Sequence, residues 1–180
     1  MKFIKLSILV MLLLVIASFQ VWAALEPAES DAFNGQDAPG FSAQTLDGKM
    51  ISLSNYKGHP VLLNFFASWC PPCRQEIGEF IKLHKKYGSR GLQIIGAATD
   101  SKLIPETSSA KEESDVRKLA ERVGIPYPIT IADQKLIEAY SFKGIPTSIF
   151  IDRKGKIVKV FYGYHNAEAF EGVLDKVVEK

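Results

Sequence analysis

Two cysteines, Cys70 and Cys73, are the residues of this 180-residue chain whose type and spacing most directly suggest chemistry. They are the only cysteines in the sequence, and Pro71 and Pro72 separate them. Two thiols at this spacing can form a disulfide, exchange it with another thiol pair, or bind a soft metal ion. The pair therefore predicts thiol chemistry.

A purely structural role for this pair is disfavoured. A disulfide between the two cysteines closes a loop of only four residues, which gives roughly 2 kcal/mol of loop-closure stabilisation and ties no distant segments together. A structural zinc site needs four ligands, and the histidines His59, His84 and His165 are scattered. We expect no structural metal site, although two thiolates could still carry a soft metal ion such as Cu(I).

The segments on either side of the cysteines predict where the thiols lie. Val61–Phe66 is a nearly continuous apolar run, typical of a buried central strand. Apolar residues at helical spacing then predict a helix over about 72–87 that ends at Gly88. Cys70 is thus expected at the helix N-terminus, where free N–H groups and the helix dipole stabilise a thiolate. Cys73 follows about one turn later.

Hydrophobic alternation and turn residues predict the other strands. Asp47-Gly48 and Asp152–Lys156 are the expected turns of two hairpins. The expected strands are Phe41–Thr45, Met50–Leu53, Leu92–Ala98, Ile129–Ala132, Thr147–Ile151 and Ile157–Tyr162.

Three further helices are expected after the cysteine-bearing one. One covers 116–123 with Ser114 or Asp115 as its cap, a short one lies around 136–140, and Ala167–Val178 closes the chain with Asn166 as its cap. Residues 99–113 are interpreted as a polar loop of unusual length, either a binding loop or an insert. The order of elements predicts an α/β fold, a central mixed sheet flanked by helices, with an N-terminal β-hairpin.

The first 23 residues are typical of an export signal. Lys2 and Lys5 precede an apolar stretch, and Val21-Trp22-Ala23 resembles a signal-peptidase site. The alternative is an uncleaved membrane anchor, because no charge occurs over the roughly 20 residues 6–25. Either interpretation places the rest of the chain outside the cytoplasm, where disulfides persist. We expect a signal peptide or anchor over 1–23, a linker over 24–38 and one domain over 39–180.

The charge balance excludes one class of partner. Cleavage after residue 23 removes two of the 22 basic side chains and leaves 20 to balance the 20 acidic ones. A nearly neutral domain lacks the excess of positive charge that is typical of nucleic-acid-binding proteins. We therefore expect no nucleic-acid partner.

Two motifs together resemble the thioredoxin fold. They are Phe66-Ala67-Ser68-Trp69-Cys70-Pro71-Pro72-Cys73 and, some 70 residues later, Gly144-Ile145-Pro146-Thr147. Further features narrow this resemblance to one group of thioredoxin-like proteins. They are the N-terminal hairpin, the export signal, the polar segment 99–113 and the sequence Cys73-Arg74-Gln75-Glu76. The chain resembles the exported TlpA/ResA-like thiol–disulfide oxidoreductases, whose relatives include cytochrome c maturation thioredoxins, over about residues 36–178.

The resemblance implies roles for the site residues. Cys70 is expected to be the exposed attacking thiol with a lowered pKa, and Cys73 the buried resolving thiol. Pro146 matches a cis-proline, which would leave the backbone of Ile145 free to pair with an extended substrate. The resemblance also places Trp69, as a platform near the sulfurs, and Pro71 and Pro72 in the substrate-binding surface.

One position departs from ordinary thioredoxin. That family carries a buried aspartate where this sequence has Asn64, and an amide cannot accept the resolving thiol's proton. Glu76 lies three residues after Cys73, on the same helical face, and matches the acidic residue of the ResA-like group. If this carboxyl is buried against the sheet, its pKa rises toward the range useful for acid–base catalysis. The alternative is a surface glutamate.

The expected function is disulfide exchange in the periplasm, or on the outer face of the membrane if the N-terminal segment stays uncleaved. Reduction is the favoured direction, because Ile145 matches reducing members of the family. The implied partners are disulfide-containing proteins, first among them apocytochrome c, and a membrane thiol-transporting reductase as electron donor. The alternatives are an oxidase or isomerase of the same fold, or a copper chaperone that uses the same two thiols. A monomer without a cofactor is expected.

Overall fold

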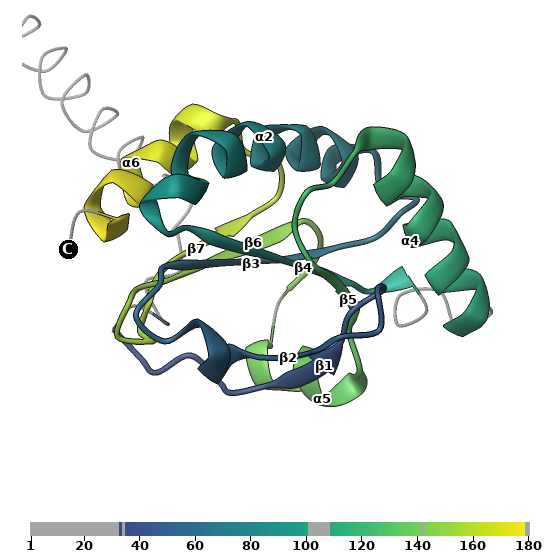
Figure 1. Cartoon of the computed structure of the whole chain (residues 1–180), viewed down its shortest axis with the longest axis horizontal. Coiled ribbons are helices and arrows are strands. Elements are labelled where there is room, and N and C mark those ends of the chain that lie inside the picture. The colour runs from purple at the N-terminus through teal and green to yellow at the C-terminus, as the bar shows by residue number, and fades with distance from the viewer. Residues whose placement is uncertain (1–32, 34, 101–108, 142, 179–180) are drawn as a thin grey trace, which may run out of the picture. The chain divides into compact units, whose positions relative to one another are not determined.

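The computed structural model describes residues 33, 35–100, 109–141 and 143–178. Within them, five strands form one mixed sheet in the order β5-β4-β3-β6-β7 (Figure 1). The central strand β3 (Val61–Phe66) is buried at every position, as its apolar sequence predicts. It pairs in parallel with β4 and antiparallel with β6. The other strands are β4 (Gln93–Ala98), β5 (Ile129–Ile131), β6 (Thr147–Ile151) and β7 (Ile157–Tyr162).

Helices cover both faces of this sheet. In Figure 1, α2 (Pro71–Tyr87) and α6 (Ala167–Val178) lie over one face, and α5 (Gln134–Tyr140) lies under the other with the hairpin of β1 (Ser42–Gln44) and β2 (Met50–Ser52). Alternate residues of β3 supply the two cores: Leu62 packs with the α2 and α6 side, and Leu63 with the opposite side. Short 3-10 helices occupy Leu53–Tyr56 and Gly88–Arg90. The predicted α/β, thioredoxin-like architecture with its N-terminal hairpin is confirmed.

The helix α4 (Ser109–Val123) begins earlier than predicted. Its first residues were expected in the polar loop, and the predicted caps Ser114 and Asp115 lie inside the helix. The i,i+4 pairs Lys111–Asp115 and Glu113–Arg117 support these polar turns, which carry little hydrophobic signal of their own. The loop prediction over 99–113 was therefore wrong for 109–113, and residues 101–108 lie outside the described part.

Residues before the predicted start of the domain at 39 also pair with its sheet. The Gly35 N–H donates to the Ile157 carbonyl over 2.7 Å, and the Ile157 N–H donates to the Gln36 carbonyl over 2.9 Å. Lys156 Nζ adds an ion pair with Asp37 over 2.8 Å. Because this segment covers one end of the otherwise open edge of β7, the linker expected over 24–38 does not extend to residue 38. The predicted signal or anchor over 1–23 lies outside the described residues.

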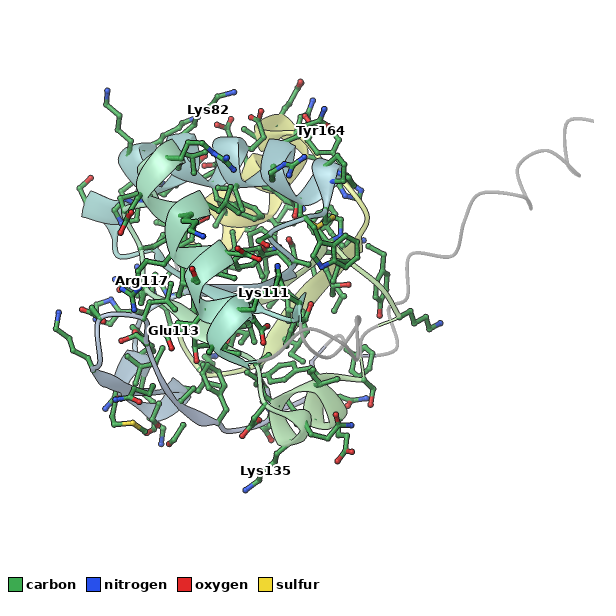
Figure 2. The ribbon with its side chains drawn as sticks, turned by 90° about the vertical axis from the view of Figure 1, so that its right-hand side faces the viewer. Lys82, Lys111, Glu113, Arg117, Lys135 and Tyr164 are labelled. Atoms are coloured by element: carbon green, nitrogen blue, oxygen red, sulfur yellow. A yellow bond between two sulfur atoms is a disulfide. The ribbon has the colours of Figure 1, made fainter. Side chains whose placement is uncertain are left out.

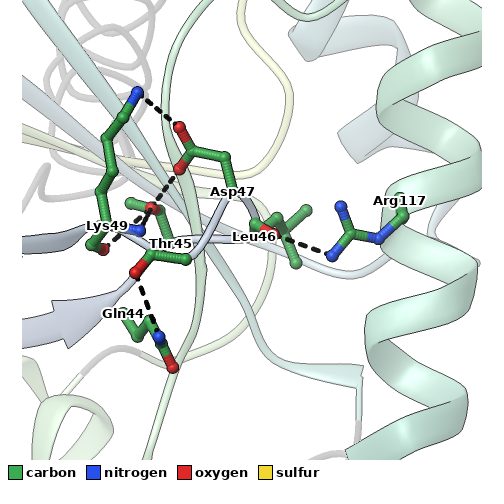
Figure 3. A network of polar contacts seen from close by, with 7 residues as sticks. Gln44, Thr45, Leu46, Asp47, Lys49 and Arg117 are labelled. Carbon is green, nitrogen blue, oxygen red and sulfur yellow. Dashed lines mark hydrogen bonds and ion pairs between the residues drawn. The ribbon is translucent and has the colours of Figure 1, made fainter.

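The hairpin is fastened to the opposite edge of the sheet and to α4, and Figure 3 shows its contact with Arg117 of α4. The Leu46 N–H donates to the Ile129 carbonyl of β5, and Arg117 Nη2 of α4 donates to the Leu46 carbonyl, both over 2.8 Å. The turn between the strands contains Gly48 at φ 84°, the left-handed conformation that Asp-Gly predicts. The hairpin thereby covers the β5 edge.

Among the described residues, no helix is both long and apolar enough to cross a membrane.

Candidate active site

Cys70 and Cys73 form a disulfide where β3 gives way to α2. The two sulfurs lie 2.07 Å apart and the two Cα atoms 5.3 Å apart. Cys70 is the N-cap of α2, and its Sγ accepts a hydrogen bond from the Cys73 N–H over 3.3 Å. Pro71 occupies the first helical position, where its missing N–H leaves no bond unmade. The helix starts one residue earlier than predicted, with Cys70 as its N-cap and Cys73 in its first turn.

The burial of Cys70 differs from the expectation. In this disulfide state Cys70 is only 4% exposed and Cys73 1% exposed. Both sulfur-bearing residues belong to an apolar cluster with Ala67 and Ile77, against which the partly buried Ile145 packs. This packing covers both cysteines in the disulfide form, and the exposure of the Cys70 thiol in the reduced protein stays a prediction.

The exposed surface beside the disulfide is supplied by its sequence neighbours. Trp69 is 44% exposed, and Pro71 and Pro72 are exposed as well. The Ile145–Pro146 bond is cis, as predicted. The Pro146 carbonyl accepts a hydrogen bond from the Gly163 N–H over 2.8 Å. Of the predicted substrate-binding residues, Trp69, Pro71 and Pro72 are therefore exposed next to the cysteines in the sequence. Ile145 instead packs against the apolar cluster that contains both cysteines.

Glu76 is buried between the active-site helix and the sheet, with 0% of its surface exposed. Its Oε2 accepts hydrogen bonds from Asn64 Nδ2 over 3.2 Å and from Ser148 Oγ over 3.0 Å. Its Oε1 accepts a hydrogen bond from the His165 N–H over 3.1 Å. The carboxyl group therefore joins α2 to β3, β6 and the loop that precedes α6. The alternative of a surface glutamate was wrong.

Burial and hydrogen bonding act on Glu76 in opposite directions. Burial disfavours the charged form and raises the pKa of the carboxyl to about 7, although the donors from His165, Ser148 and Asn64 favour the carboxylate and limit the rise. The expected upward direction is confirmed. A carboxyl group with a pKa near 7 can accept or donate a proton under neutral conditions.

Two of the residues that donate hydrogen bonds to Glu76 were not identified from the sequence. Ser148 lies in a strand whose five residues are all buried, so a serine beside the apolar residues of this strand was a usable signal. His165 contributes its backbone N–H, and no side-chain pattern reports that contact. Among the described residues, no group of three or more His, Cys, Asp or Glu side chains could hold a metal ion.

These features define a class of protein. A Cys-x-x-Cys disulfide at the N-terminus of a helix, directly after the central strand of a mixed sheet and beside a cis-proline, is the arrangement of a thioredoxin-like thiol–disulfide oxidoreductase.

The comparisons with known proteins agree with this class. The model of the AhpC/TSA family matches residues 34–160, and the chain belongs to this thioredoxin-like family. The chain is 36% identical over 144 residues to the thiol-disulfide oxidoreductase ResA of Bacillus thuringiensis, covering 79% of this chain and 78% of that protein. It is 36% identical over 170 residues to the thioredoxin-like protein YneN of Bacillus subtilis, covering 94% and 95%.

A solved structure with the same fold is the thiol:disulfide interchange protein of the thioredoxin family from Chlorobium tepidum. It superposes with a TM-score of 0.70 at 32% identity and covers 81% of this chain and 97% of that one. The predicted resemblance to ResA-like oxidoreductases is therefore confirmed.

Proposed function

We propose that this protein is an extracytoplasmic protein-disulfide reductase. The observation that carries the proposal is the buried Glu76 carboxyl, one helical turn after Cys73 and held by three donors. Reduction needs a base for the resolving thiol at the moment when Cys73 attacks. The identity of Ile145, which matches reducing members of the family, supports this direction.

The exchange balances as a two-electron transfer. The Cys70 thiolate attacks one sulfur of the substrate disulfide, which releases a substrate thiolate and forms a mixed disulfide. Cys73 gives its proton to the Glu76 carboxylate and attacks the Cys70 sulfur, which releases the second substrate thiolate. The product is the Cys70–Cys73 disulfide seen in the structure. Its re-reduction requires two electrons and two protons from a dithiol donor.

The surface around the sulfurs is assigned to substrate binding. Trp69, Pro71 and Pro72 would contact the polypeptide that carries the substrate disulfide, with Ile145 and Pro146 on the adjacent loop. The proposed substrate is a protein disulfide such as that of an apocytochrome c Cys-x-x-Cys-His segment, and the proposed donor is a membrane thiol-transporting reductase. We propose a periplasmic, monomeric protein that begins near Ala24. N-terminal sequencing of exported protein that finds Lys2 would instead support the membrane-anchored form.

The reduction potential of the Cys70–Cys73 couple tests the direction. Equilibration of the purified protein with glutathione redox buffers should place the couple well below the glutathione potential, as for thioredoxin at about −270 mV. The reduced protein should then reduce insulin disulfides, and the Cys70→Ser variant should not. A couple near −120 mV, with oxidation of reduced substrate faster than reduction, would assign the protein as an oxidase.

A further inference from the structure

The turn that precedes Cys70 is held by a buried carboxylate, that of Asp100, which follows β4. The Ser68 N–H donates to Asp100 Oδ2 over 2.9 Å, and Ser68 Oγ donates to Asp100 Oδ1. One residue earlier, the N–H and the hydroxyl of Thr99 both donate to the Phe66 carbonyl, over 2.8 and 3.0 Å. Four hydrogen bonds thus fasten the turn between β3 and α2 to the end of β4.

Asp100 is suited to carry a negative charge in this position. Both of its oxygens accept hydrogen bonds from donors of a single residue, which fits the ionised carboxylate. The residue is 2% exposed, so water screens its field only weakly. Lys111 of α4, labelled in Figure 2, interacts electrostatically with Asp100 and forms an ion pair with Asp115. On α2, Arg74 Nη1 donates to the Ser68 carbonyl over 3.3 Å.

The carboxylate lies close enough to the active-site sulfur to influence it. Ser68 is two residues before Cys70, and the Cys70 N–H closes the turn onto the Ala67 carbonyl over 3.2 Å. Consecutive Cα atoms are about 3.8 Å apart, so Asp100 lies within roughly 10 Å of Cys70. Coulomb's law at that separation, with an effective dielectric constant of about 20, corresponds to about a tenfold change in an ionisation equilibrium.

We propose that Asp100 is a positioning residue that holds the Cys70 turn through Ser68 and, by its charge, destabilises the Cys70 thiolate and keeps the reduction potential low. It opposes the α2 N-terminus, which stabilises the same thiolate. Cys73 and Glu76 on α2 and Glu112 on α4 are further buried ionisable groups on the helices that pack around the site. The inference depends on thiol–disulfide exchange at Cys70 and holds for either direction of that exchange.

Asp100→Asn tests the inference, because it keeps the shape and removes the charge. We expect the Cys70 pKa to fall, measured as the pH dependence of iodoacetamide alkylation in a Cys73→Ser background. In the protein with both cysteines, the equilibrium constant with glutathione should shift about tenfold toward the dithiol, which raises the potential by about 30 mV. Asp100→Ala should change the Cys70 pKa and the reduction potential in the same directions. It does not place a side-chain amide against the Ser68 N–H, so it replaces Asp100→Asn if that protein does not fold.

Two controls separate charge from packing. Ser68→Ala removes one hydrogen bond and keeps the carboxylate, so its potential should stay near that of the wild type. Asp133→Asn alters an exposed aspartate that caps α5 on the opposite face of the sheet and should leave the Cys70 pKa unchanged. Wild-type Cys70 pKa and potential in a folded Asp100→Asn or Asp100→Ala protein would overturn the inference. A shift of equal size in Ser68→Ala would overturn it as well.

Discussion

Asn64 Nδ2 donates a hydrogen bond to Glu76 Oε2 over 3.2 Å and so joins the central strand to the active-site helix inside the protein. The same amide nitrogen also lies within hydrogen-bonding distance of the Thr147 carbonyl and Ser148 Oγ. By its resemblance to thioredoxin, Asn64 matches the position of that family's buried acid, and here it donates to a carboxyl group supplied by α2. An amide suits this place because it donates to the carboxylate without adding a second negative charge.

Glu76→Gln should slow disulfide reduction by roughly 10²-fold, the contribution of one acid–base group. The variant keeps the size of the side chain but cannot accept the Cys73 proton. The thiol pKa values should fall, because a negative neighbour is lost. A pH–rate profile on insulin measures both effects. Glu79→Gln is the matched control, since Glu79 lies one turn further along α2 and accepts a hydrogen bond from the Ala167 N–H. Superimposable profiles for wild type and Glu76→Gln, with equal melting temperatures, would contradict the role of Glu76.

The stability of the oxidised protein should depend on pH through Glu76. Its pKa is raised from 4.5 in the unfolded chain to about 7 in the folded protein, so the folded state binds more protons between these values. The contribution of Glu76 is fully present below pH 4.5 and is lost as the pH rises through 7. Relative to Glu76→Gln, the wild-type free energy of unfolding should fall by about 3 kcal/mol over this window. Urea titrations at pH 4.5 and pH 8 measure it, and a constant difference would refute the expectation.

Asn64→Asp should place two carboxyl groups in one buried site. Like charges this close cannot both ionise without a large cost, so one group should keep its proton to higher pH. The variant should therefore be more destabilised at pH 8 than at pH 5. Thermal melts at both values compare it with Asn55→Asp, which alters an exposed asparagine on a 3-10 helix. Equal destabilisation at the two pH values would rule out the charge effect.

Cys70 should be the more reactive thiol of the reduced protein. The Cys73 N–H already points at Cys70 Sγ, and the α2 N-terminus favours a negative charge there. The Cys70 pKa should lie below the ordinary thiol value of about 8.5. Iodoacetamide alkylation against pH in the Cys73→Ser and Cys70→Ser proteins assigns each thiol. Similar profiles for the two proteins would reverse this assignment.

The sequence by itself determined the elements and the reactive pair. The apolar run of Val61–Phe66 and the helical spacing after Cys73 are local patterns, and they locate the strand, the helix and the thiols at its N-terminus within a residue. The Asp47-Gly48 turn and the strands β6 and β7 were also predicted from local sequence patterns. These features were predictable because backbone preference and hydrophobic period act over a few neighbouring residues.

Only the tertiary structure decided what surrounds the chemistry. Ser148 and His165 reach Glu76 across 72 and 89 residues of sequence, and Asp100 reaches Ser68 across 32. The burial of Cys70 and the start of α4 at Ser109 likewise depend on what packs against them. The sequence does not show which residues meet in these contacts, because a buried polar group is stable only when distant segments bring donors and acceptors to it.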